Sequence, residues 1–195
     1  SYKPFSYPDF LNVVTTGIAA KKIAYVYDFI EQKASLLPKA IREDTKKLAL
    51  AYHEFSIGEY GSAAKKALTL QTNNPIFGLR ATLLVLRCNL EFYLDKPTSY
   101  RQTFLSTCNK VRRHIEGLKK PLAQKKQGYL AHLAIVESIF NYVDSGSSTY
   151  EELEKIKQEI QDAKILVAWQ YLKEKTTYLM EMKKSGKNHK NLSPK

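Results

Sequence analysis

Residues 75–94 read PIFGLRATLLVLRCNLEFYL, and this stretch decides the fold class. Proline is favoured in the first turn of a helix, and the apolar residues that follow recur at alternating spacings of three and four, the period of one helix face. That face consists of Ile76, Leu79, Leu83, Leu86, Leu90 and Tyr93. A second apolar row contains Phe77, Leu84 and Leu94. Two apolar rows predict burial on two sides, so we expect this segment to be the central helix.

The same apolar spacing recurs on both sides of this stretch and predicts about nine helices in all. Gly and Pro number only 8 and 7 among the 195 residues, and they separate the periodic segments. The expected helices cover residues 9–17, 19–36, 38–57, 60–71, 75–94, 98–117, 121–143, 150–162 and 165–183. Thr149 followed by Glu152 fits a capping box at the start of the eighth. The sequence therefore predicts an all-α protein.

A family resemblance is carried by the residues around the turn at Gly58. They are Leu50-Ala51, Ile57-Gly58-Glu59-Tyr60, Ala63, Ala67-Leu68-Thr69-Leu70 and Asn73-Asn74-Pro75. This pattern resembles a tetratricopeptide repeat, in which a small residue lets two helices approach, Gly and Tyr shape the turn, and Pro opens the next repeat. Residues 40–182 as a whole are similar to the carboxyl-terminal part of uncharacterised bacterial helical-repeat proteins of a Bacteroidetes type. The resemblance implies a right-handed stack of antiparallel helix pairs, a TPR-like α-solenoid.

This architecture predicts one helical-repeat domain over residues 1–183. Within it we expect an N-terminal helix pair at 1–37, three repeat-like hairpins at 38–162 and a capping helix at 163–183. Residues 184–195 are basic and have no apolar repeat, so we expect a disordered tail there. The chain begins without Met, which is compatible with a piece of a longer repeat protein.

Cysteine usage and hydropathy bear on the compartment. Cys88 and Cys108 lie in apolar helical stretches rather than in a disulfide framework, which favours a reducing compartment. Buried free thiols are the favoured interpretation, and a disulfide across a helical hairpin is the alternative. No run of residues approaches the roughly 18 to 20 apolar residues that a membrane span requires. We therefore expect a cytoplasmic protein without membrane contact.

Catalytic and metal-binding patterns are missing from the sequence. The histidines, which show no metal-ligand spacing, are His53, His114, His132 and His189. No glycine-rich phosphate loop and no nucleophile elbow occurs. We therefore expect a protein that is not an enzyme, with no catalytic residues, no cofactor and no metal.

A partner-binding groove is the leading functional hypothesis, because the first helix of each repeat lines the concave surface in this architecture. The candidate groove residues are Tyr52, Phe55, Arg80, Arg87 and Glu91. An arginine there can bind a partner carboxylate bidentately. The structural alternative is an Arg87–Glu91 ion pair at i,i+4, worth about 0.3 to 0.5 kcal/mol. The groove hypothesis predicts a non-enzymatic protein–protein interaction scaffold for a peptide or helix of an unknown protein.

Polyanion binding is the second functional hypothesis, and it rests on clustered cations between residues 110 and 126. They are Lys110, Arg112, Arg113, Lys119, Lys120, Lys125 and Lys126. Cations at a helix C-terminus meet its dipole favourably, which explains part of the cluster. Nucleic acid or another polyanion could contact the rest, together with the basic tail. A solvated surface is the favoured interpretation, because no aromatic residues interleave with these lysines as a stacking platform requires.

Overall fold

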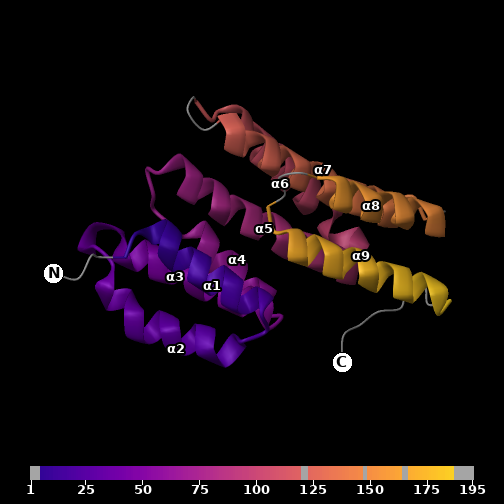
Figure 1. Ribbon diagram of the computed structural model, residues 1–195. Helices are drawn as coiled ribbons and strands as arrows, with labels where there is room; N and C mark the ends of the chain where they lie inside the picture. The colour runs from indigo at the N-terminus through magenta and orange to yellow at the C-terminus, as the bar shows by residue number, and fades with distance from the viewer. Residues whose placement is uncertain (1–4, 120–122, 147–148, 164–166, 187–195) are drawn as a thin grey trace. The chain divides into compact units, whose positions relative to one another are not determined.

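The computed structural model describes residues 5–119, 123–146, 149–163 and 167–186, and this part of the chain is helical without any strand (Figure 1). Nine α-helices are described there, joined by a short 3-10 turn at Ala34–Leu36 and by loops. The helices are α1 Tyr7–Ala19, α2 Ile23–Lys33, α3 Lys39–Ser56, α4 Tyr60–Leu68, α5 Pro75–Asp95, α6 Pro97–Glu116, α7 Ala123–Asp144, α8 Tyr150–Asp162 and α9 Trp169–Lys184. The predicted all-α class is confirmed. The nine described helices also match the number that the apolar spacing predicts.

Two compact units make up the chain, Ser1–Cys88 and Asn89–Lys195, and the boundary between them lies inside α5. The first residues of α5 therefore belong to the core of the first unit and its last residues to the core of the second. The solenoid arrangement, its handedness and the division of residues 38–162 into three hairpins stay predictions.

In the first unit, α1, α2 and α3 pack against one another, and α4 packs against α3. The α3–α4 hairpin turns at Gly58, whose φ of +87° is a left-handed conformation that favours glycine. The Gly58 amide donates to the carbonyl of Phe55 and so satisfies one of the last acceptors of α3. The turn that the sequence predicts at Gly58 is therefore present.

In the second unit, α6 packs against α7, α7 against α8, and α9 against both α7 and α8. The centre of this unit is aromatic: the ring of Phe140 lies 4.7 Å from the rings of both Tyr93 and Phe104, centroid to centroid. At the start of α8, the Thr149 side chain accepts from the Glu152 amide and the Glu152 carboxylate accepts from the Thr149 amide. The predicted capping box is thus confirmed.

Two helix starts differ by four residues from the sequence-based expectation. Lys21 has a φ of 59° and Ala168 a φ of 53°, and a non-glycine residue in this left-handed region interrupts a regular helix. The second helix therefore begins at Ile23 rather than at residue 19, and the last begins at Trp169 rather than at residue 165. Val167, which falls inside the expected range 165–183, therefore lies before α9. Of the predicted tail, Lys184 belongs to α9, and residues 187–195 lie outside the described residues.

Candidate functional site

Arg87, one of the candidate groove residues, lies against two aromatic rings of α3 in the first unit. Its guanidinium carbon is 5.6 Å from the ring centroid of Tyr52 and 5.3 Å from that of Phe55. The side chain is only 9% exposed, and its Nε donates to the carbonyl of Leu83 on the preceding turn. A desolvated cation–π contact of this kind contributes about 2 kcal/mol. The structure thus brings three of the predicted groove residues together, as a contact within the chain.

Arg80 lies two helical turns before Arg87 and contacts a different helix. Its Nη2 donates to Oδ1 of Asn12 on α1, with 3.2 Å between the two atoms. Its Nη1 is buried and has no hydrogen-bond acceptor among the described residues. Arg80 therefore joins α5 to α1, whereas Arg87 joins α5 to α3.

Glu91 belongs to the second unit, where its carboxylate accepts two hydrogen bonds from α9. The Tyr171 hydroxyl donates to Oε1 over 2.8 Å, and the Lys175 ammonium donates to Oε2 over 2.7 Å. The same ammonium lies 5.4 Å from the ring centroid of Tyr178. Glu91 is therefore paired within the protein, and its contacts attach α9 to the end of α5.

The α9 partners of Glu91 are residues that the sequence reasoning missed. Tyr171, Lys175 and Tyr178 are spaced by four and three, so they share one face of a helix. The spacing shows that the lysine lies between two tyrosines on one helix face, and it does not tell which carboxylate the lysine meets. The paired side chain on α5 is 84 residues away in the sequence.

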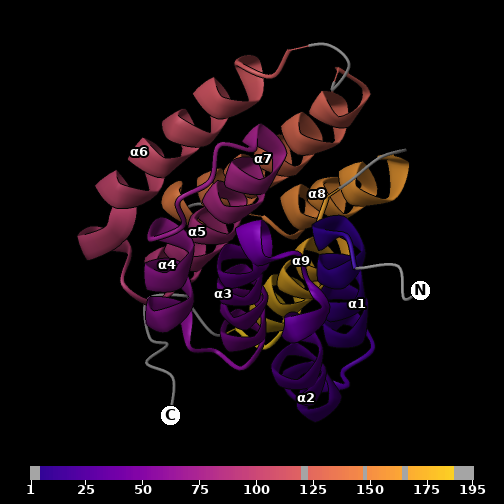
Figure 2. The same cartoon turned by 90° about the vertical axis from the view of Figure 1, so that its left-hand side faces the viewer.

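The described cations of the second candidate site lie where α6 and α7 meet, on the surface of the second unit. These two helices run side by side and are joined by residues 117–122 (Figure 2). The exposed members are Lys110, Arg112, Arg113, Lys119 and Lys125, with Lys126 half-buried. Lys120 lies outside the described residues. The structure therefore gathers the described cations of the predicted patch at one end of a helical hairpin.

Three of these cations have a contact inside the hairpin. Arg112 pairs with Glu137 of α7, and this carboxylate raises the pKa of the guanidinium through a hydrogen bond. The Lys126 ammonium donates to the carbonyl of Glu116 and the Arg113 Nε to that of Asn109, each over 3.4 Å. Both carbonyls lie in the last turns of α6, where the helix dipole attracts cations.

The other three cations have no such contact. Among the residues that the structure describes, no carboxylate lies within ion-pair range of Lys110, Lys119 or Lys125. Lys125 also stands in the first turn of α7, where the dipole of the helix repels a cation. These exposed charges have no ion-pair partner within the described part of the chain, so they are accessible to an anionic partner.

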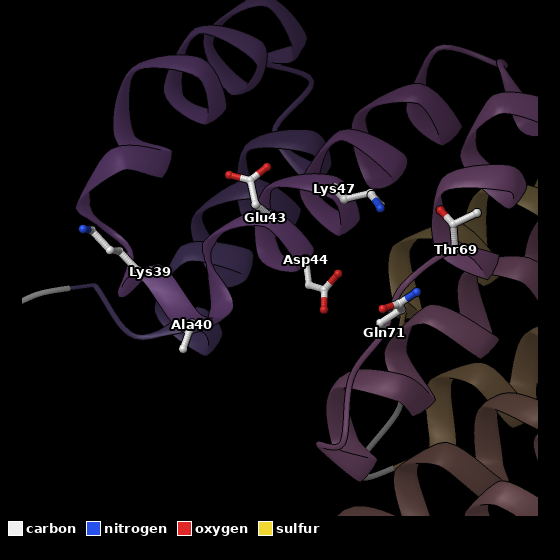
Figure 3. A pocket seen from close by; sticks show the side chains of 7 residues that line it. All are labelled: Lys39, Ala40, Glu43, Asp44, Lys47, Thr69 and Gln71. Carbon is white, nitrogen blue, oxygen red and sulfur yellow. The ribbon is translucent and has the colours of Figure 1, made fainter.

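A surface hollow of about 380 Å³ lies in the first unit, between the start of α3 and the segment after α4 (Figure 3). Its lining residues are Lys39, Ala40, Glu43, Asp44, Lys47, Thr69 and Gln71. In Figure 3, the side chains of Asp44 and Lys47 lie on the side facing Thr69 and Gln71. Two lysines balance two carboxylates in this lining, so the hollow has no net charge with which to select a charged ligand.

Groups that support redox or metal chemistry do not converge in the described residues. No cluster of three or more His, Cys, Asp or Glu side chains there has metal-binding geometry. His132 is buried, with Nδ1 2.8 Å from the Val167 carbonyl, and His189 lies outside the described residues. Cys88 and Cys108 are both buried as thiols, so the disulfide alternative is not realised.

Over the described ranges, none of the helices combines the length and the apolar character needed to cross a membrane.

Comparisons of the chain with protein-family models, with curated proteins and with solved structures find no match, so the resemblance to tetratricopeptide repeats stays a prediction.

Proposed function

We propose that this protein is a non-enzymatic binding protein that holds a polyanion at the basic end of the α6–α7 hairpin. The basic end consists of Lys110, Arg113, Lys119, Lys125 and Lys126. The observation that carries the proposal is that Lys110, Lys119 and Lys125 are exposed and meet no carboxylate among the described residues. A polyanion that contacts these cations releases its condensed counterions, and this release drives the association.

The position of the lysines in the two helices supports this proposal. Cations in the last turns of α6 stabilise that helix, but Lys125 at the start of α7 destabilises its helix by a few tenths of a kcal/mol. Lys125 therefore carries a charge that no contact within the described residues compensates. An approaching anion would meet both the lysines and the amide groups of the first turn of α7, which favour negative charge for the same electrostatic reason.

The groove hypothesis receives less support from the contacts within the chain. Arg87 is stacked on Tyr52 and Phe55, and Glu91 already accepts from Tyr171 and Lys175. A partner would have to replace these desolvated contacts before it gained any of its own, which makes binding there costly. The scaffold for a peptide or helix stays a prediction, and the polyanion is the function that the geometry favours.

A charge-matched pair of variants tests the proposal with heparin as the polyanion. In the first variant Lys110, Lys119 and Lys125 are replaced by Gln, and in the control Lys155, Lys157 and Lys183 are replaced by Gln. All six side chains are exposed, so both variants lose the same charge without loss of a buried contact. The dissociation constant for heparin is measured by fluorescence anisotropy over a series of salt concentrations.

The proposal expects a localised effect. The basic-end variant should bind heparin at least about tenfold more weakly at low salt, and its log–log salt slope should fall by about three, one for each lost contact. The control should bind nearly as the unaltered protein does. Equal weakening in both variants would mean that only the net charge of +12 matters, and the basic end would then not be the binding site.

A further inference from the structure

The outward face of α6 extends the basic end along a row of polar side chains. We call this row the α6 lane; its exposed members are Ser99, Gln102, Ser106, Asn109, Lys110 and Arg113. Their spacings of three, four, three, one and three keep them on one side of the helix. The opposite side is buried and consists of Phe104, Cys108, Val111 and Ile115. The lane is therefore a solvent-facing surface of hydroxyl, amide and cationic groups.

No carboxylate lies between the members of the lane. No Asp or Glu occurs between Asp95 and Glu116, so α6 carries no acidic residue before its last position. Two carboxylates of α7 lie beside α6, and both are paired: Asp144 receives two hydrogen bonds from Arg101, of 2.9 and 2.8 Å, and Glu137 pairs with Arg112. An anion that approaches the lane between Ser99 and Arg113 meets no unpaired negative charge from these residues, and the exposed carboxylate of Glu116 follows one turn after Arg113.

The neutral side chains of the lane are open for binding. Gln102, Ser106 and Asn109 make no side-chain hydrogen bond with any residue that the structure describes. Hydroxyl and amide donors together with Lys and Arg are the groups that contact the phosphates and sugars of nucleic acids, and such contacts make up half to two-thirds of all protein–DNA hydrogen bonds. The lane supplies hydroxyl and amide groups from Ser99 to Asn109 and its two cations, Lys110 and Arg113, where it meets the basic end.

The dimensions of the lane fit a duplex. Ser99 and Arg113 are separated by a rise of about 21 Å at about 1.5 Å per residue, which corresponds to about six base-pair steps of about 3.4 Å. The Tyr and Phe residues of α6 lie off the lane: Tyr100 is stacked on Phe92 with 5.1 Å between the ring centroids, and Phe104 is buried. Single-stranded nucleic acid is usually held by aromatic rings that stack on its bases, and the lane offers none.

We propose that the polyanion is double-stranded DNA, whose sugar–phosphate backbone lies along the α6 lane and continues onto the basic end; this inference rests on the proposed function. An exposed α-helix can lie at the wide major groove of B-form DNA with its side chains on the phosphates that border the groove, whereas the major groove of an A-form RNA duplex is too deep and narrow for this. Contacts to phosphates carry no base information, so the binding is independent of sequence.

A neutral variant separates this inference from simple charge attraction. In the lane variant Gln102, Ser106 and Asn109 are replaced by Ala, which removes hydrogen-bond donors and no charge. The control replaces Gln32, Gln161 and Thr177 by Ala; these are exposed neutral residues of α2, α8 and α9. Binding is measured by anisotropy with a labelled DNA duplex of about 20 base pairs, with the RNA duplex and the DNA single strand of the same sequence, and with heparin.

The lane variant should bind the DNA duplex about five- to tenfold more weakly, with an unchanged salt slope, because no counterion contact is lost. Its affinity for heparin should change by less than about twofold, since heparin binding depends on charge alone. The control should match the unaltered protein with every probe. A DNA duplex of scrambled sequence should bind equally well.

Other outcomes would overturn the inference in distinguishable ways. If the lane variant binds DNA normally while the basic-end variant is weakened for DNA and heparin, the proposed function stands and the role of the lane is wrong. If RNA duplex or single-stranded DNA binds as tightly as duplex DNA, with the same dependence on the lane, the assignment to double-stranded DNA is wrong. If the basic-end variant binds all probes normally, the proposed function itself fails.

Discussion

The Lys175 ammonium of α9 lies 2.7 Å from the Glu91 carboxylate of α5, and the two side chains are only 16% and 8% exposed. Two charges that are removed from water in this way depend on each other, because either one alone would be buried without compensation. The Tyr171 hydroxyl donates to the same carboxylate and completes the set. This relationship gives Glu91 a structural role within the second unit.

Replacement of Glu91 by Ala should destabilise the protein by about 3 kcal/mol, because it leaves the Lys175 ammonium largely buried without its partner. The double variant Glu91→Leu with Lys175→Met should lie within about 1 kcal/mol of the unaltered protein, because it removes both charges and keeps the volume. Urea unfolding followed by circular dichroism measures both changes. Unaltered stability of the Glu91→Ala protein would mean that the carboxylate is available to a partner, as the groove hypothesis requires.

Replacement of Arg87 by Ala should lower the melting temperature by about 4 to 8 °C, since the lost contacts with Tyr52 and Phe55 are worth about 2 kcal/mol. Arg87→Lys should give an intermediate value, because an ammonium keeps the charge but not the planar stacking surface. Differential scanning calorimetry measures these shifts. The groove hypothesis expects the opposite result, a melting temperature near that of the unaltered protein when Arg80 and Arg87 are both replaced by Ala.

Replacement of Asp144 by Ala should cost about 2 to 3 kcal/mol at neutral pH, because it leaves the hydroxyl of the buried Tyr93 without its acceptor and Arg101 without its partner. In Tyr93→Phe protein the same replacement should cost clearly less, since there is no hydroxyl left to satisfy. Urea unfolding of the four proteins forms a double-mutant cycle. A coupling energy of zero would show that the Tyr93–Asp144 hydrogen bond contributes nothing.

The stabilising effect of Asp144 should also depend on pH. The hydrogen bond from Arg101 holds the pKa of this carboxyl below its usual value in the folded state. Stability from Asp144 is therefore fully present above the unfolded-state pKa of about 3.9 and is lost as the pH falls through the lower folded-state value. The difference in unfolding free energy between the unaltered protein and the Asp144→Asn variant should accordingly shrink in acid. A constant difference between neutral pH and about pH 2 would contradict this mechanism.

Replacement of Gly17 by Ala should destabilise the first unit by about 1 to 3 kcal/mol, because the new Cβ would lie 2.5 Å from Cγ2 of the buried Val26. The close approach of α1 and α2 at this point depends on the missing side chain. Gly61→Ala is the matched control, since no atom lies within 4 Å of a Cβ at that helical position. The control should leave the urea midpoint unchanged or raise it slightly, and an equal loss in both variants would contradict the packing argument.

The Cys108 thiol should be inert in the folded protein. Burial raises the pKa of this thiol to about 12, with a further rise from the nearby Glu137 carboxylate. The reactive thiolate is therefore not populated at mildly alkaline pH, where an unfolded cysteine with a pKa of about 8.5 reacts. Labelling of Cys108 by a disulfide reagent near pH 8 should occur only on unfolding. The Cys108→Ser protein keeps only the Cys88 thiol, so its labelling identifies the signal of Cys88. Rapid labelling of Cys108 in the native state would show that the site opens.

The lysines of the basic end and the candidate groove residues differ in how well the sequence alone predicts their surroundings. Clustered lysines are visible in the sequence, and a surface cluster of like charges stays on the surface because burial without partners is prohibitive. For Arg87 and Glu91 the spacing shows only that both lie on one side of a helix. Their aromatic and basic partners come from other helices, so the sequence does not reveal that these side chains are already occupied.

The sequence by itself determined the all-α class, the helices of the described chain and many of their ends. Apolar periodicity, the turn at Gly58 and the capping box of Thr149 are local signals, because each depends on neighbours a few residues away. Only the tertiary structure decided that Glu91 meets Tyr171 and Lys175, which follow it by 80 and 84 residues. It also decided that the two α7 carboxylates beside α6 are paired, Asp144 with Arg101 and Glu137 with Arg112. Which helix faces meet depends on the packing of whole surfaces, and no local pattern of residues specifies that choice.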